Sequence, residues 1–176
     1  MKVIETRLPG VRIIEPRLHG DSRGFFIETF QADRYRLEAG IDRPFVQDNN
    51  SRSGRGVLRG MHSQRKRPQG KLVRVARGSA FDVAVDIRRD SATFGKWVGV
   101  TLDALSQRQL WIPPGFAHGF LALEDDTHFL YKTTDYYAKD CERAIVWNDP
   151  AIGIVWPDLG MTPLLAPKDA AAVGLT

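Results

Sequence analysis

The feature that most constrains this chain is a regular alternation of apolar and polar residues in short runs. In residues 80–87 the odd positions carry Phe, Val, Val and Ile, whereas the even positions carry Ala, Asp, Ala and Asp. A period of two is typical of a half-buried β-strand. Turn residues separate this run from eight others that are rich in β-formers. Those runs are 25–30, 56–62, 71–77, 97–102, 108–112, 117–123, 127–134 and 143–147.

Many short strands at this spacing predict an all-β fold, either a sandwich or a barrel. Helix is scarce: residues 31–39, which are followed by Gly40, predict one short helix, and residues 168–173 predict another. The segment after Trp156 is rich in Pro and Ala and is expected to wrap the surface. No repeat, low-complexity linker or composition shift divides the chain, and 176 residues are enough for one core. We therefore expect a single domain over residues 1–176.

The composition narrows the compartment and the partners. The net charge of +4 rests on scattered arginines without a continuous stripe, which disfavours nucleic acid but suits a small polyanion such as a nucleoside diphosphate. No apolar stretch approaches the roughly 20 residues of a membrane helix, and the N-terminus lacks the apolar run of a signal peptide. Cys141 is the only cysteine, so no internal disulfide can form. These features predict a cytoplasmic protein with no membrane or nucleic-acid partner.

Two of the four histidines lie in suggestive settings. His118 ends a Pro-x-Gly-x-x-His turn, which some metal-binding β-barrels use for one ligand, and His62 ends the run 56–62. Such barrels also need a His-x-His pair and a nearby Glu, whereas Ser and Gln follow His62. Zinc or iron usually takes three protein ligands from the His and carboxylate set. The sequence therefore predicts no metal site.

The sequence disfavours nucleophilic hydrolysis and favours proton transfer. No Gly-x-Ser-x-Gly elbow or Gly-rich phosphate loop occurs, and Cys141 lies between two acidic residues that disfavour a thiolate. His62 can act as a base near neutral pH, an inward Lys71 could stabilise an enolate oxygen, and Tyr131 could deliver a proton. Each also has a structural alternative, such as an exposed lysine at a strand end or a core tyrosine. Together they are the parts needed to invert a carbon beside a carbonyl without a cofactor.

Ordered sequence blocks over nearly the whole chain resemble the dTDP-4-dehydrorhamnose 3,5-epimerases of nucleotide-sugar biosynthesis. The blocks are Gly20-Asp21-x-Arg23-Gly24-Phe25-Phe26-x-Glu28, Phe45-Val46-Gln47-Asp48-Asn49, Gly56-Val57-Leu58-Arg59-Gly60-x-His62, Gln69-Gly70-Lys71-Leu72-Val73-Arg74, Phe81-Asp82-Val83-Ala84-Val85-Asp86-Ile87-Arg88, Thr93-Phe94-Gly95-Lys96-Trp97, Gln109-Leu110-Trp111-Ile112-Pro113, Gly115-Phe116-Ala117-His118-Gly119-Phe120, Phe129-Leu130-Tyr131-Lys132-Thr133-Thr134-x-Tyr136-Tyr137 and Trp147-Asn148-Asp149-Pro150.

The resemblance implies a double-stranded β-helix of cupin type with a few short helices, without metal or cofactor, that forms a homodimer. It implies a dTDP-4-keto-6-deoxyglucose substrate that is inverted at C3 and C5 to give dTDP-4-keto-rhamnose. In this interpretation His62 is the base, oriented by Asp169 from the C-terminal segment. Tyr131 is the proton donor on the opposite face of the sugar, and Lys71 holds the enolate oxygen.

The resemblance also assigns residues that bind the substrate. Arg23 and Arg59 would bind the diphosphate, because arginine forks suit phosphate oxygens, and Tyr137 would stack on the thymine ring. In the family an N-terminal arm crosses the dimer, so Arg23 and Glu28 are expected to serve the neighbouring subunit's site. The remaining positions expected around the nucleotide and sugar are Phe25, Glu28, Gln47, Asn49, His118, Glu142 and Lys168.

Three positions qualify the resemblance. Ser63 stands where the family usually has an aromatic residue, which is expected to loosen the sugar pocket. Met61 replaces the usual Leu, a swap of similar volume. Strict alternation would put Arg59 and His62 on opposite strand faces, and a β-bulge near Gly60 would reconcile them.

Two alternatives stay open from the sequence. One is an enzyme of the same fold that inverts only one carbon or acts on a related 4-keto sugar. The other is a barrel that binds a nucleotide sugar without turning it over, which would have no use for a base and an acid on opposite faces of its ligand.

Overall fold

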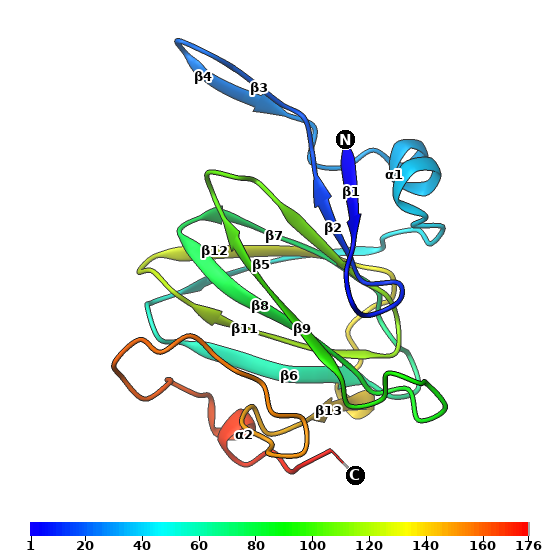
Figure 1. Ribbon diagram of the computed structural model, residues 1–176, viewed down its shortest axis with the longest axis vertical. Helices are drawn as coiled ribbons and strands as arrows, with labels where there is room; N and C mark the ends of the chain where they lie inside the picture. The colour runs from blue at the N-terminus through cyan, green and yellow to red at the C-terminus, as the bar shows by residue number, and fades with distance from the viewer. Residues whose placement is uncertain (176) are drawn as a thin grey trace.

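The computed structural model describes residues 1–175 as two antiparallel sheets with a hairpin that projects from one end (Figure 1). In spatial order, the six-stranded sheet contains β1 (Lys2–Glu5), β2 (Arg12–Glu15), β10 (Gln109–Ile112), β7 (Lys71–Arg77), β12 (Thr127–Thr133) and β5 (Gln47–Ser53). The five-stranded sheet contains β13 (Glu142–Ala144), β6 (Leu58–Gln64), β11 (Phe116–Ala122), β8 (Ser79–Asp86) and β9 (Trp97–Asp103). The hairpin consists of β3 (Leu18–Asp21) and β4 (Gly24–Ile27).

Strands that are distant in sequence are neighbours in both sheets. For example, β10 lies between β2 and β7, and β11 lies between β6 and β8. This arrangement is the double-stranded β-helix, or cupin-like jelly roll. The all-β prediction and the fold implied by the resemblance are therefore confirmed, and each of the runs predicted as a strand overlaps an observed strand.

The main core lies between the two sheets. Phe129 of β12 stacks on Phe120 of β11 with ring centroids 4.0 Å apart and planes 6° apart, which joins the two sheets near the centre. Val73 and Val75 of β7 and Leu110 of β10 are fully buried in the same cluster. The face-to-face contact explains why these strands carry large apolar residues at alternate positions.

The prediction that residues 80–87 form a half-buried strand is wrong in one respect, because β8 is buried on both faces. Its small residues Ala80 and Ala84 face the core between the sheets. Val83 and Val85 lie on the other face and pack with Ile152 and other residues of the C-terminal half. The C-terminal segment covers this outer face, so the larger side chains are buried there as well.

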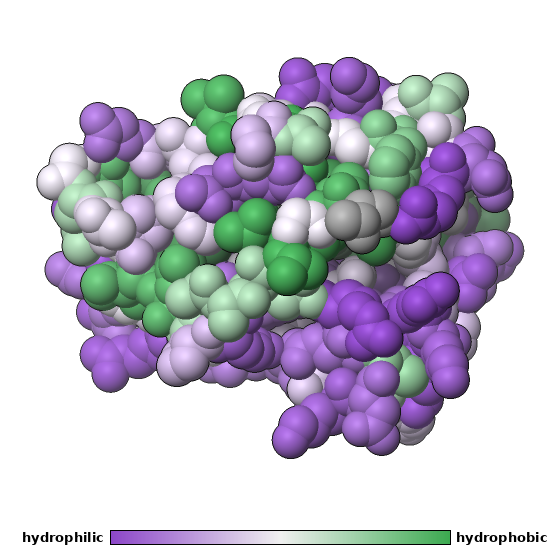
Figure 2. Space-filling view, turned by 90° about the horizontal axis from the view of Figure 1, so that it is seen from below, coloured by the Kyte–Doolittle hydropathy of each residue, from purple (hydrophilic) through white to green (hydrophobic). Residues whose placement is uncertain are grey.

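The segment after Trp156 wraps the surface as predicted. Val57 forms a parallel bridge with Leu164, and Ile145 forms one with Val173. Met161 and Leu164 remain exposed, and Figure 2 shows apolar side chains gathered across this face of the molecule. The short helix α2 (Pro167–Ala170) lies within this segment and contacts β6.

The other helix covers the outer face of the six-stranded sheet. Helix α1 (Ala32–Ala39) ends at Gly40, whose φ of 63° is left-handed, as the sequence predicted. Tyr35 is buried against Ile14 and Trp111 of the sheet. A single 3₁₀ turn, η1 (Lys139–Cys141), follows β12. None of the helices in residues 1–175 is long and apolar enough to cross a membrane.

Four strands were not predicted: β1, β2, β3 and β5. The sequence of β5 is Gln-Asp-Asn-Asn-Ser-Arg-Ser, which is polar and contains no β-branched residue. It forms a strand because β12 offers it a complete antiparallel edge from Thr127 to Thr133. Tertiary pairing therefore overrides a low intrinsic β-propensity.

The bulge expected near Gly60 is present. Residues His118 and Phe120 of β11 pair with His62 and Arg59 of β6, so β6 contains one extra residue between them. A Cβ atom at Gly60 would lie 2.5 Å from the Gly119 Cα, so the close approach of the two backbones requires glycine. The extra residue lets Arg59 and His62 both reach the same cavity.

We predict that replacing Gly119 by Ala destabilises the fold. The new Cβ would lie 2.7 Å from Met61 Sδ and 2.8 Å from the Arg59 carbonyl oxygen, and such overpacking costs about 1–3 kcal/mol of the free energy of unfolding. Urea unfolding measures the loss. As the control, Gly54→Ala meets nothing closer than Asp125 Oδ1 at 3.5 Å and should change stability by less than about 0.5 kcal/mol. Equal urea unfolding midpoints for the two variants would contradict the close approach of the β6 and β11 backbones at the bulge.

Candidate active site

A cavity of about 490 Å³ opens between the two sheets and the C-terminal segment. The five-stranded sheet contributes His62 of β6 and His118 of β11. The six-stranded sheet contributes Lys71 of β7 and Tyr131 of β12. Asp169 of α2 closes one side. The cavity therefore collects side chains from segments that are far apart in the sequence.

His62 forms a short hydrogen bond to Asp169, with 2.6 Å between His62 Nε2 and Asp169 Oδ1. Asp169 is 1% exposed, and its Oδ2 also accepts a hydrogen bond from the Gly60 backbone N–H at 3.3 Å. If Nε2–H donates to the carboxylate, the Nδ1 atom of His62 is left as the basic nitrogen. Burial lowers the pKa of His62 and outweighs the opposing influence of Asp169. The imidazole is therefore neutral at pH 7, as a general base must be.

Lys71 lies inside the barrel, with its Nζ 3.5 Å from His118 Nδ1. Burial lowers the pKa of Lys71 to about 8, although nearby Asp82 favours the charged form. Most Lys71 side chains therefore still carry a charge at pH 7. An ammonium group in this cavity can stabilise negative charge that develops on a substrate oxygen.

Asp82 belongs to this site, although the sequence analysis did not select it. Its Oδ1 lies 2.6 Å from His118 Nε2, and both residues are buried. A proton on Nε2 directed at Asp82 leaves Nδ1 as an acceptor that faces Lys71. The available signal was an aspartate at position 82, between two alanines on the same face of β8. The structure thus contains two histidine–aspartate pairs at one cavity.

Tyr131 faces the cavity from the sheet opposite to His62. Burial raises the pKa of the Tyr131 phenol above its ordinary value of 10. The phenol is therefore protonated at neutral pH and can donate a proton. Because His62 and Tyr131 stand on opposite sheets, a ligand between them would present a different face to each.

Charged and aromatic residues surround the mouth of the cavity. Lys168 Nζ pairs with Glu142 Oε1 at 2.8 Å, and the Tyr137 hydroxyl donates to Glu142 Oε2 at 3.3 Å. The Arg59 guanidinium donates through Nε to Ser53 Oγ at 3.1 Å. Four residues that the resemblance assigned to substrate binding line the cavity, namely Arg59, Tyr137, Glu142 and Lys168.

Two predicted residues lie beside the cavity rather than in its lining. The Gln47 amide donates to Asn49 Oδ1 at 2.9 Å and accepts a hydrogen bond from the Tyr137 backbone N–H at 3.0 Å. Asn49 pairs with Tyr131 across the β5–β12 ladder. Gln47 therefore holds the backbone of Tyr137, and Asn49 lies directly opposite Tyr131 in the sheet.

Three other predicted residues do not line the cavity of their own chain. Arg23 and Phe25 belong to the projecting hairpin, where Arg23 pairs with Asp21 at 2.6 Å. Glu28 follows the hairpin and pairs with Arg34 of α1 at 2.8 Å. A single chain does not bring these residues to His62.

Ser63 lies on the opposite face of β6 from His62, because alternate residues of a strand point to opposite sides. Ser63 nevertheless lines the catalytic cavity, and it also borders a second hollow of about 300 Å³ that is lined by Arg143 and Leu175. The expectation that Ser63 loosens the sugar pocket therefore stays a prediction.

The donor groups of the cavity do not suit a divalent metal. Within residues 1–175 no group of three His, Cys, Asp or Glu side chains could hold a metal ion. His62 and His118 are each engaged with an aspartate, and the Lys71 ammonium stands next to His118. A cation placed between the two imidazoles would be repelled by this ammonium group.

Comparisons with known proteins agree with this geometry. The sequence model of the dTDP-4-dehydrorhamnose 3,5-epimerase family matches residues 5–176. The enzyme of that name from Salmonella typhimurium is 55% identical over 173 residues, which cover 98% of this chain and 94% of the relative. A relative from Neisseria gonorrhoeae is 56% identical over 97% of this chain, which spans about half (52%) of the relative's length.

Solved structures show the same likeness. The Legionella pneumophila epimerase in complex with dTDP-4-keto-L-rhamnose has a TM-score of 0.96 and 55% identity, covering 99% of this chain and 92% of that one. A 3′-monoepimerase from Streptomyces bikiniensis in complex with dTDP-quinovose has a TM-score of 0.91 and 36% identity, covering 97% of this chain and 86% of that one. This chain belongs to the dTDP-4-dehydrorhamnose 3,5-epimerase family.

Proposed function

We propose that this protein is a dTDP-4-dehydrorhamnose 3,5-epimerase, an isomerase that converts dTDP-4-dehydro-6-deoxy-D-glucose to dTDP-4-dehydro-L-rhamnose. The observation that carries the proposal is the placement of the His62–Asp169 pair and of Tyr131 on opposite walls of one cavity. The relative from Salmonella typhimurium that carries this name matches over 94% of its length. A cytoplasmic location remains a prediction of the sequence.

The reaction needs only proton transfers. The C4 ketone makes the hydrogens at C3 and C5 acidic, because the electron pair left on carbon moves onto the ketone oxygen as an enolate. His62 Nδ1 takes the proton from one face, and the Lys71 ammonium stabilises the enolate oxygen. The Tyr131 hydroxyl then returns a proton to the carbon from the other face. The carbon is inverted without any change of oxidation state, so no redox cofactor is required.

The second proton transfer requires the two groups to be reset. After one inversion His62 is protonated and Tyr131 is a phenolate. A proton must pass back to Tyr131 through substrate or solvent before the second carbon reacts. Asp169 stabilises the imidazolium that forms in each cycle, because its carboxylate lies 2.6 Å from His62 Nε2.

The cationic rim suits the nucleotide. Arg59 and Lys168 lie at the cavity mouth, where they can bind diphosphate oxygens, and Tyr137 offers an aromatic ring to the thymine base. His118 lies close to Lys71 at the sugar end. A barrel that only binds a nucleotide sugar would have no need for two histidine–aspartate pairs at its cavity.

The projecting hairpin supports a homodimer in which each arm completes the partner's site. Phe25 and Phe26 are 54% and 71% exposed in the single chain, and water-exposed aromatic pairs on an extended arm are typical of an interface. Arg23 would bring a further cation to the diphosphate. Phe25 and Glu28 would approach the nucleotide and sugar in the same way.

We expect incubation with the 4-keto-6-deoxyglucose nucleotide in deuterated water to introduce two deuterons per sugar, at C3 and C5, because both carbons exchange through the enolate. NMR of the product measures the incorporation. His62→Asn is the matched negative control: turnover should collapse while the Kd for dTDP stays within about twofold. Exchange at one carbon alone would support a monoepimerase, as in the Streptomyces relative, and would sink the double reaction.

We predict a bell-shaped pH profile of kcat/KM. Activity needs neutral His62, so it is lost as pH falls through the pKa of His62, which burial places below 6.5. Activity also needs the Lys71 ammonium, so it is lost as pH rises through a pKa of about 8. Tyr131 cannot cause that basic limb, because its pKa is raised above 10. An acid limb centred above pH 6.5 would contradict the assignment of His62 as a buried neutral base.

Mixed dimers test the crossed arms. His62→Asn and Arg23→Ala chains, each with its own affinity tag, are expressed together and the heterodimer is purified. If each arm serves the partner, the site of the His62→Asn chain receives the Arg23→Ala arm and carries both substitutions. The other site then has neither substitution, so activity at low substrate should approach about half of the wild-type value. Arms that serve their own chain would leave both sites damaged, and the heterodimer would be as weak as its parents.

A further inference from the structure

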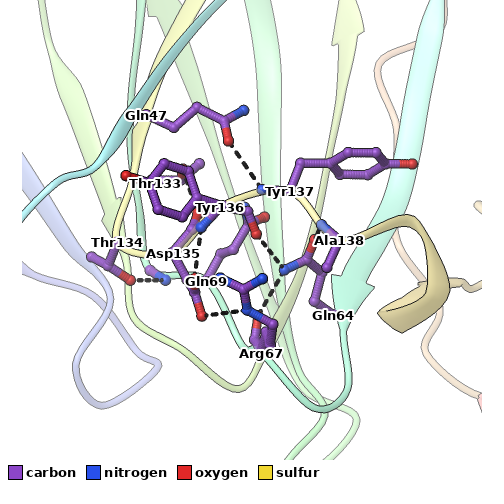
Figure 3. Close-up of polar contacts among 11 residues, drawn as sticks. Gln47, Gln64, Arg67, Gln69, Thr133, Thr134, Asp135, Tyr136, Tyr137 and Ala138 are labelled. Carbon is purple, nitrogen blue, oxygen red and sulfur yellow. Dashed lines mark hydrogen bonds and ion pairs between the residues drawn. The ribbon is translucent and has the colours of Figure 1, made fainter.

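The segment that carries Tyr137 lies outside both sheets. Residues 134–138 connect β12 to η1 and have neither helical nor strand structure. Their backbone polar groups therefore need partners other than a β-ladder. Figure 3 shows that glutamine side chains provide many of these partners, while the Tyr137 ring projects away from the hydrogen-bonded cluster.

Gln64 makes three hydrogen bonds around Tyr137. Its Nε2 donates to the Tyr136 carbonyl at 3.2 Å and to the Arg67 carbonyl at 2.7 Å. Its Oε1 accepts from the Ala138 backbone N–H at 2.7 Å. Gln64 therefore holds the residues directly before and after Tyr137, and its side chain is buried, with 7% of the residue exposed.

Only an amide side chain of this length meets those requirements. Two carbonyl oxygens demand donors and one backbone N–H demands an acceptor, and a Gln amide has both kinds of group. A Glu carboxylate at neutral pH offers no donor, and a Met thioether is only a weak acceptor. The set of partners also fixes which end of the amide is nitrogen, because the reverse orientation would set two carbonyl oxygens against an oxygen.

Two further glutamines hold the same segment. Gln47 of β5 accepts from the Tyr137 backbone N–H at 3.0 Å, and Gln69 donates to the Asp135 carbonyl at 2.8 Å. Gln64 is the central member, because it makes more bonds to the segment and lies two residues after His62 on the same strand face. The loop is thereby fixed with respect to the strand that carries the base.

We propose that Gln64 is a positioning residue that holds Tyr137 at the cavity mouth, ready to receive the nucleotide base of the substrate. This inference rests on the proposed function, since it takes the ligand to be a nucleoside diphosphate. A segment without these bonds would have to be ordered when the ligand binds, and that ordering weakens affinity. The nucleotide base lies away from the reacting carbons of the sugar. The lost binding free energy is therefore the same in the ground state and in the transition state.

The test replaces Gln64 by Met, which keeps the length of the side chain and removes its hydrogen bonds. We expect KM and the Kd for dTDP to rise about tenfold, with kcat within about twofold of the wild type. The matched control is Gln107→Met, which removes another buried glutamine whose Nε2 donates to the Ala104 carbonyl at 2.7 Å. Gln107 does not line the catalytic cavity, so KM and the Kd for dTDP should stay unchanged there.

A double-mutant cycle with Tyr137→Ala separates positioning from general structural support. If Gln64 acts through Tyr137, the Gln64→Met/Tyr137→Ala variant should bind dTDP no more weakly than Tyr137→Ala alone. Additive losses, or a fall in kcat with unchanged KM, would overturn the inference. Should Gln64→Met fail to fold, Gln69→Met, which removes a single bond to the segment, should raise KM about threefold in the same cycle.

Failure of the inference can be told from failure of the proposed function. If wild-type protein neither binds dTDP nor turns over the 4-keto sugar nucleotide, the proposed function is wrong and the cycle has no baseline. If the wild type does both while the cycle is additive, the function stands and only the role of Gln64 is refuted.

Discussion

The hydrogen bond between His62 and Asp169 is the interaction on which the site depends. It joins residues 107 positions apart in the sequence, and it ties the C-terminal segment to the strand that carries the base. The same carboxylate accepts from the Gly60 backbone N–H, which lies in the β-bulge. One buried aspartate thus holds the imidazole and the irregular strand together. The C-terminal segment thus supplies the group that orients His62.

The low polarity of the barrel interior explains how the remaining groups can work near neutral pH. Burial disfavours charge, so it keeps His62 uncharged and Tyr131 protonated, which are the forms that a base and an acid require. Lys71 is the exception that must carry charge in the same environment. The negative charge of Asp82 favours the ammonium form of Lys71 and partly compensates for burial. The two histidine–aspartate pairs therefore have separate tasks, one for proton abstraction and one beside the cation.

Much of the fold and the centre of the site could be predicted from the sequence. Alternation located β8 and its neighbours, because a jelly roll buries alternate residues between two sheets. The bulge at Gly60 could be predicted because Arg59 and His62 had to reach one cavity from a strand. The polar strand β5 could not, since its pairing comes from the free edge of β12 and not from its own residues. Asp82 was missed because its partner, His118, is 36 residues away.

The sequence by itself determined the residue types: two histidines, a lysine, a tyrosine and a distant aspartate, set in strands of period two and in blocks that resemble a known family. Only the tertiary structure decided which of them meet. It placed His62 and Tyr131 on facing sheets and left Arg23, Phe25 and Glu28 away from the cavity of their own chain. The physical reason is that the residues of a strand determine only which side of the sheet each side chain points to. The pairing of distant strands and the path of the C-terminal segment fix what that face meets.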